Sequence, residues 1–194
     1  KAPEDGSFDV WDDMMERVIT GLNSENIKYF MGYSDNTNLS FLLATLCDIA
    51  SIYGNHIGAF SMEPLDISLV NAYNFITGNN LIQHPYELCE DPTIENPNDD
   101  PRAPYFLTKD VEWKSLDNKE IYLEGRLIGG CLDVLSILVG TRFDNVKEFN
   151  EKYKDDGIIF FLEACDLNLL SFIRSIWQLE HAGWFKHCKG IILG

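Results

Sequence analysis

The chain has 194 residues, 45% hydrophobic and 24% charged, which excludes a disordered tail, a collagen-like fibre and a disulfide-dense miniprotein. Thirty-one acidic residues against fifteen lysines and arginines give a net charge of −16, which disfavours nucleic acid and anionic membranes as partners. No apolar run reaches the roughly 20 residues of a membrane span. Five cysteines without a CxxC pair indicate reduced thiols, and we expect a cytoplasmic protein without a zinc site.

Charge and proline are unevenly distributed and predict three segments. Residues 1–84 carry eleven acids and three bases, residues 85–101 six acids and no base, and residues 102–194 fourteen acids and twelve bases. Four of the seven prolines lie in the middle segment, and proline interrupts helices and strand ladders. We predict an α/β lobe up to residue 84, an exposed connector over residues 85–110 and a second α/β lobe over residues 111–194. A long surface loop within one domain is the alternative interpretation of the connector.

The first lobe is predicted to contain three helices and one strand. Apolar residues at helical spacing predict an amphipathic helix over residues 10–22, and the apolar run 27–31 predicts a buried strand. The strand leads through the sequence GYSD at residues 32–35 into an apolar helix over residues 39–47. A further helix, opened by a proline, is predicted over residues 64–78.

The second lobe is predicted to alternate strands and helices, which indicates a parallel α/β architecture. The predicted elements are a strand over 120–123, a glycine-rich turn over 125–130, a helix over 131–139, a polar, solvent-facing helix over 144–153, a buried strand over 157–162, a helix with an apolar stripe over 169–177 and a last strand over 190–194. A buried parallel strand needs a crossover beside it, so we expect both lobes to be incomplete. A complete small domain whose last strand lies at an edge is the alternative.

The strongest local signal for chemistry is the sequence GYSD between a strand and a helix. Ligands of open α/β sheets bind beyond the carboxyl ends of the strands, so Ser34 is expected to face a cleft at a helix N-terminus. The positive end of the helix stabilises an oxyanion there, and the backbone amide of Asp35 points into the same space. This is the logic of a nucleophile elbow, although the G-x-S-x-G pattern is absent. The alternative is that Ser34 or Asp35 only caps the helix.

Glu163 is the second candidate, because it follows the apolar run 157–162 and a carboxylate there could orient a histidine. The alternative is a strand-end acid that faces water. The stretch 125–130 lacks the lysine of a phosphate loop and is predicted to be a tight turn. No histidine stands at metal-ligand spacing, so we expect no metal site; the four are His56, His84, His181 and His187.

Three motifs, in this order, resemble the LD-carboxypeptidase family of serine peptidases. They are MGYSDNT at residues 31–37, GRLIGG at residues 125–130 and IFFLE at residues 159–163. The family includes murein tetrapeptide carboxypeptidases and microcin C self-immunity proteins. The resemblance runs from about residue 27 to residue 194, including the family's turn and strand over residues 184–194. It implies a Ser-Glu-His triad across a cleft between two lobes.

The resemblance implies roles for single residues. Ser34 matches the nucleophile, Asp35 supplies an oxyanion amide and Glu163 matches the triad carboxylate. The family's histidine lies downstream of the strand that matches Ile191–Leu193, so the 194-residue chain alone is expected to be inactive. No match to the family's glycine-rich oxyanion turn precedes Ser34, and Cys131 stands where many members carry asparagine.

The resemblance also implies a substrate class. We expect hydrolysis of a muropeptide tetrapeptide between L-lysine or diaminopimelate and D-alanine, in peptidoglycan recycling, with no cofactor and in a homodimer. The alternatives are a microcin-type peptidyl-nucleotide hydrolase, a non-catalytic remnant and an unrelated ligand-binding protein. Trp113 could stack on a nucleobase, although such a residue more often covers a core.

Overall fold

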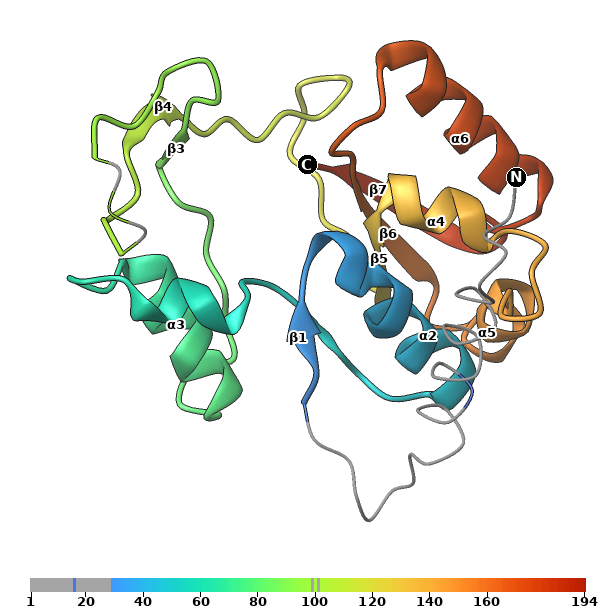
Figure 1. Cartoon of the computed structure of the whole chain (residues 1–194). Coiled ribbons are helices and arrows are strands. Elements are labelled where there is room, and N and C mark those ends of the chain that lie inside the picture. The colour runs from blue at the N-terminus through green and yellow to red at the C-terminus, as the bar shows by residue number, and fades with distance from the viewer. Residues whose placement is uncertain (1–15, 17–28, 99, 101) are drawn as a thin grey trace, which may run out of the picture. The chain divides into compact units, whose positions relative to one another are not determined.

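The structure of the chain is a computed structural model that describes residues 16, 29–98, 100 and 102–194 (Figure 1). It divides into two compact units, one formed by residues up to Tyr53 together with Leu123–Gly194, the other by Gly54–Tyr122. The helix predicted over residues 10–22 lies outside the described residues except for Glu16, which is helical. No helix among the described residues is long and apolar enough to cross a membrane.

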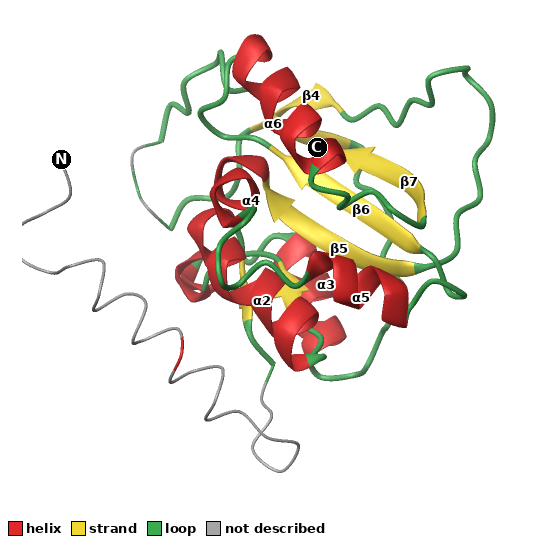
Figure 2. Ribbon diagram, turned by 90° about the vertical axis from the view of Figure 1, so that its right-hand side faces the viewer, coloured by secondary structure: helices red, strands yellow, loops and turns green. Residues whose placement is uncertain are grey.

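The first unit is built on a parallel sheet of three strands (Figure 2). The strands are β5 (Arg126–Cys131), β6 (Ile158–Glu163) and β7 (Cys188–Leu193), with β6 in the centre. The apolar run of β6 is mostly buried, as expected of a strand that is covered on both faces. The strands predicted over residues 157–162 and 190–194 are therefore confirmed. Cys131 pairs with Glu163, so β5 and β6 end side by side.

Residues 126–130 of the glycine-rich stretch belong to the strand β5, so the prediction of a tight turn over residues 125–130 was wrong. Gly129 and Gly130 have φ values of 154° and 144°. A Cβ atom on Gly129 would lie 1.8 Å from the carbonyl oxygen of Phe161, and one on Gly130 would lie 2.6 Å from the Thr37 side chain. The glycines therefore allow β5 to approach its neighbours closely. The strand predicted over residues 120–123 was also wrong, because β5 begins only at residue 126.

Four helices of the first unit confirm sequence predictions, with ends shifted by a few residues. They are α2 (Thr37–Cys47), α4 (Leu132–Leu138), α5 (Val146–Lys152) and α6 (Leu169–His181). The helix α5 is not purely solvent-facing, because Val146, Phe149 and Asn150 are buried. In α6, most of the predicted apolar stripe is exposed, namely Leu169, Ile173 and Trp177, whereas Leu179 is buried.

The core of the first unit joins these helices to the sheet. Trp184 follows α6 and is completely buried. Its ring stacks on Phe41 of α2, with 5.3 Å between the ring centroids, and its Nε1 donates a hydrogen bond to Asp144 at 3.0 Å. The burial of a large aromatic side chain with its polar atom satisfied makes this contact a major source of stability.

A second sheet of the first unit has two short parallel strands, β1 (Met31–Gly32) and β2 (Ile52–Tyr53). The strand predicted over residues 27–31 is shorter than expected, since only Met31 of that run belongs to β1, and Ile27 and Lys28 lie outside the described residues. Gly32 pairs with Tyr53, which brings the GYSD sequence beside the end of β2.

The second unit contains η2 (Ile57–Ser61), α3 (Ile67–Ile76) and an antiparallel pair of strands, β3 (Leu88–Glu90) and β4 (Leu107–Asp110). The helix predicted over residues 64–78 starts later, because Asp66 caps it by accepting a hydrogen bond from the Ser68 amide at 2.8 Å.

The bounds of the compact units differ from those of the predicted lobes. The predicted connector over residues 85–110 is largely exposed but contains β3 and β4. Residues of the predicted first lobe are divided between the two units at Tyr53. The division into domains at residues 84 and 110 stays a prediction. The mixed α/β fold with parallel strands is confirmed.

Candidate functional site

Ser34 lies at the junction between a strand and a helix, as predicted. It opens the short helix η1 (Ser34–Asn36), two residues after β1 ends and immediately before α2. Its φ of 58° places it in the left-handed region, which costs an ordinary residue about 1–3 kcal/mol. A strained serine between a strand and a helix is the conformation of a nucleophile elbow.

The alternative that Ser34 or Asp35 only caps the helix is wrong. The N-cap residues of η1 and α2 are Tyr33 and Asn36, and neither makes a capping hydrogen bond through its side chain. The left-handed backbone of Ser34 is therefore not explained by helix capping, and it leaves the serine at the positive end of α2.

Glu163 is the last residue of the central strand β6, as predicted, and is half-buried. Its carboxylate accepts a hydrogen bond from the hydroxyl of Tyr53, and that hydroxyl accepts one from the Ser34 amide at 2.9 Å. The structure thus brings the Ser34 backbone amide and the Glu163 carboxylate to one phenol, and Glu163 is not simply a strand-end acid that faces water. The sequence analysis missed Tyr53. It lies at the end of β2, a strand of two residues that the sequence did not predict.

Thr37 and Cys131 extend this arrangement to β5. Thr37 is buried, and its hydroxyl accepts a hydrogen bond from the Cys131 amide at 3.0 Å. Cys131 is only 2% exposed, and burial raises the pKa of its thiol to about 11. Cys131 is therefore a neutral thiol at neutral pH and not a nucleophile.

Carboxylates surround the loop that follows β6. Asp133 in the first turn of α4 accepts hydrogen bonds from the Cys165 amide at 3.1 Å and the Asp166 amide at 3.3 Å. The charge of Asp166, then burial, then the charges of Asp133, Glu163 and Asp35 raise the pKa of the exposed Cys165 thiol. The raised pKa of the Cys165 thiol therefore reports the negative electrostatic potential beside the candidate site.

Replacing Asp166 with asparagine is expected to speed the alkylation of Cys165 by neutral iodoacetamide at pH 8 by about two- to fivefold, because more of the thiol is ionised. Mass spectrometry of the tryptic peptides measures the rate at each cysteine. The control is Asp155→Asn, which removes an exposed acid before the opposite end of β6. Equal rates for Asp166→Asn and the unaltered protein would contradict this electrostatic interpretation.

The two histidines of the first unit interact elsewhere. The Nδ1 atom of His181 lies 2.9 Å from the carbonyl oxygen of Trp177, and the Nε2 atom of His187 lies 3.1 Å from Glu151. His56 and His84 belong to the second unit. Within residues 16, 29–98, 100 and 102–194, no group of three histidine, cysteine or acidic side chains could hold a metal ion.

Trp113 lies in the second unit and is 69% exposed. The interpretation that it covers a core is therefore wrong. Its stacking on a nucleobase stays a prediction.

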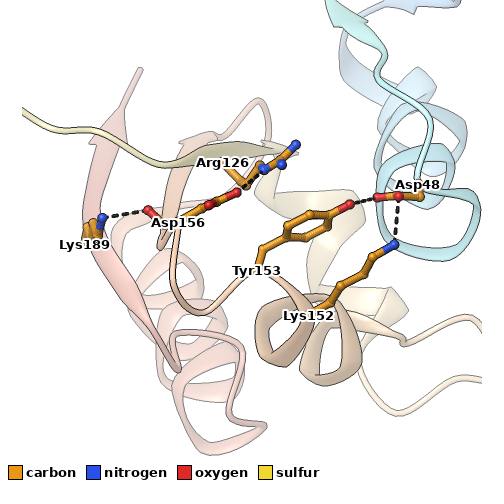
Figure 3. Close-up of polar contacts among 6 residues, drawn as sticks. All are labelled: Asp48, Arg126, Lys152, Tyr153, Asp156 and Lys189. Carbon is orange, nitrogen blue, oxygen red and sulfur yellow. Dashed lines mark hydrogen bonds and ion pairs between the residues drawn. The ribbon is translucent and has the colours of Figure 1, made fainter.

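The opposite end of the three-stranded sheet carries exposed ion pairs (Figure 3). Arg126 lies over the ring of Tyr153 and pairs with Asp156 at 2.8 Å. The hydroxyl of Tyr153 donates a hydrogen bond to Asp48, which also pairs with Lys152 at 2.8 Å. Exposed ion pairs contribute little to the stability of a fold. The hydrogen bond between Tyr153 and Asp48 is of the same chemical kind as that between Tyr53 and Glu163 but lies away from the candidate site, so it serves below as a comparison.

The last third of the chain matches a protein-family model. Residues 124–194 match the model of the LD-carboxypeptidase C-terminal domain. No curated protein matches the chain. The matched residues include β5, β6 and β7.

Three solved structures similar to the chain extend this finding. Muramoyltetrapeptide carboxypeptidase from Oxalobacter formigenes is 21% identical, with a TM-score of 0.52 over 86% of this chain and 46% of its own. MccF in complex with glutamyl sulfamoyl guanosine is 22% identical, with a TM-score of 0.59 over 93% of this chain and 51% of its own. The MccF-like protein from Streptococcus pneumoniae in complex with AMP is 20% identical, with a TM-score of 0.59 over 92% of this chain and 58% of its own. The chain spans about half the length of these proteins, and the likeness shows the fold.

Proposed function

Because residues 124–194 match the LD-carboxypeptidase C-terminal domain, we propose that the chain belongs to this family and carries the nucleophile and the triad carboxylate of a serine carboxypeptidase. The observation that supports the proposal is the left-handed turn at Ser34, which a single phenol connects to Glu163. The reaction is hydrolysis of an amide bond at the C-terminal side of a peptide.

In the proposed mechanism the Ser34 hydroxyl attacks the carbonyl carbon while a histidine takes its proton. Glu163 orients the imidazole, and the Asp35 amide donates a hydrogen bond to the oxyanion. The histidine then protonates the leaving amine, and water hydrolyses the acyl group from Ser34. His181 and His187 already bond to other groups, so neither is assigned as the base.

The proposed substrate is a murein tetrapeptide cut between L-lysine or diaminopimelate and D-alanine. This follows the similarity to a muramoyltetrapeptide carboxypeptidase. A cytoplasmic role in peptidoglycan recycling, as a homodimer, is part of the proposal. Because MccF is solved with glutamyl sulfamoyl guanosine, the assay includes a peptidyl-nucleotide as a second substrate.

The product of the complete reading frame is expected to release D-alanine from the tetrapeptide, and Ser34→Ala to lower kcat by about 10³-fold or more. A fluorophosphonate probe is expected to label Ser34 alone. The control is Ser61→Ala, which removes an exposed hydroxyl of the second unit and leaves the rate unchanged.

Three outcomes would contradict this proposal. Release of D-alanine by Ser34→Ala at the unaltered rate would remove Ser34 from the mechanism. Hydrolysis of the peptidyl-nucleotide alone would correct the substrate. Failure of the complete protein to react with either substrate or with the probe would indicate a non-catalytic remnant.

A further inference from the structure

We propose that Tyr53 is a positioning residue that holds the turn bearing Ser34 against the carboxylate of Glu163, an inference that rests on the proposed function. Tyr53 lies 19 residues after Ser34 and 110 residues before Glu163. Its single hydroxyl hydrogen-bonds to both residues. It therefore connects the first residue of η1, which follows β1, to the last residue of β6, which belongs to another sheet.

The phenol is fixed from two sides. The backbone of Tyr53 pairs with that of Gly32 in β1, two residues before Ser34. Its ring contacts Phe161 of β6, two residues before Glu163, with 5.1 Å between the ring centroids and 55° between the ring planes. The hydroxyl is therefore held at a defined place between the nucleophile turn and the end of β6.

The direction of the two hydrogen bonds follows from the protons available. The Ser34 amide can only donate, so the phenol oxygen accepts from it at 2.9 Å. The phenol has one proton, which is left for the Glu163 carboxylate. Burial, followed by the hydrogen bond to Glu163, raises the pKa of Tyr53, so the phenol remains a donor throughout the neutral range.

This arrangement leaves free the atoms that the proposed mechanism uses. Tyr53 occupies Oε1 of Glu163 and so restrains the carboxylate, and the proposed mechanism uses Oε2 for the imidazole. Tyr53 also occupies the Ser34 amide, and the mechanism uses the next amide, that of Asp35, for the oxyanion. In this proposal Tyr53 acts through Ser34 and Glu163 and is therefore a positioning residue.

The test compares Tyr53→Phe with Tyr153→Phe in the product of the complete reading frame. Each variant removes one phenol–carboxylate hydrogen bond and keeps the ring, but Tyr153 bonds to Asp48 at the other end of the sheet. Turnover is divided by the fraction of molecules labelled at Ser34, so loss of folded protein does not alter the result. We expect Tyr53→Phe to lower kcat about 10- to 100-fold with little change in KM, and Tyr153→Phe to leave both within about twofold.

A second measurement does not depend on activity. Exchange of the Ser34 amide hydrogen with solvent is expected to be at least about tenfold slower in the unaltered protein and in Tyr153→Phe than in Tyr53→Phe. Unaltered kcat in Tyr53→Phe, or a Ser34 amide that exchanges at the unprotected rate in the unaltered protein, would overturn the inference. If Ser34→Ala keeps full hydrolysis while Tyr53 still protects the Ser34 amide, the proposed function fails and the contact through Tyr53 stands.

Discussion

Gly129→Ala is expected to lower the free energy of unfolding of the first unit by about 4 kcal/mol. The new Cβ atom would lie 1.8 Å from the carbonyl oxygen of Phe161, on the strand paired with β5. A backbone oxygen in the centre of a sheet cannot move away as the end of a flexible side chain can. The φ of 154° adds strain for any residue with a side chain.

Urea unfolding followed by tryptophan fluorescence measures the change. Two control variants separate the clash from the strain. Gly140 has a φ of 75°, and a Cβ atom added to it would meet no atom within 4 Å, so Gly140→Ala is expected to cost about 1–2 kcal/mol. Gly58 lies in the second unit and has neither a positive φ nor a close neighbour, so Gly58→Ala is expected to change the free energy of unfolding of the first unit by about 0.5 kcal/mol or less. A cost for Gly129→Ala no larger than that for Gly140→Ala would refute the close approach of β5 to β6.

Trp184→Ala is expected to lower the free energy of unfolding of the first unit by about 3–5 kcal/mol. The side chain is 0% exposed, stacks on Phe41 and donates a hydrogen bond to Asp144. Its removal leaves a large cavity in the core and takes the Nε1 donor from Asp144. Because the cavity lies between α2 and the rest of the core, little rearrangement can close it.

Trp177→Ala is the matched control, because this residue belongs to the same unit but is 61% exposed. Its ring stacks on His181, with 4.0 Å between the ring centroids. The control is expected to cost about 1 kcal/mol or less. Since both variants lose a tryptophan, circular dichroism and not fluorescence follows their thermal unfolding. Similar losses of unfolding free energy in the two variants would show that the packing of Trp184 is not a major source of stability for the first unit.

The sequence predicts best where a local pattern decides the structure. The apolar run of β6 identifies a buried strand, and the meeting of strand and helix patterns at residues 31–47 places Ser34 at a junction. Glu163 was found for the same reason, because it directly follows a recognisable strand. In these cases no distant residue is needed to interpret the pattern.

Predictions failed where the partner lies far away in the sequence. Gly129 and Gly130 were interpreted as a turn because glycine often marks one, but their neighbours are Phe161 and Thr37. Tyr53 was missed because its partner Glu163 is 110 residues away. The same limit explains α6, whose apolar residues form a stripe by spacing but are largely exposed in the structure.

The discontinuity of the first unit has a consequence for synthesis on the ribosome. Ser34 and Tyr53 emerge before the contiguous second unit, and Glu163 emerges after it. Domains usually fold during translation from the N-terminus onward, but here the unit that begins first is completed last. The nascent turn that bears Ser34 therefore has no carboxylate partner until β6 has left the ribosome. A product terminated early, within residues 54–122, would carry Ser34 without Glu163, so truncation by itself would yield a protein that cannot form the proposed pair.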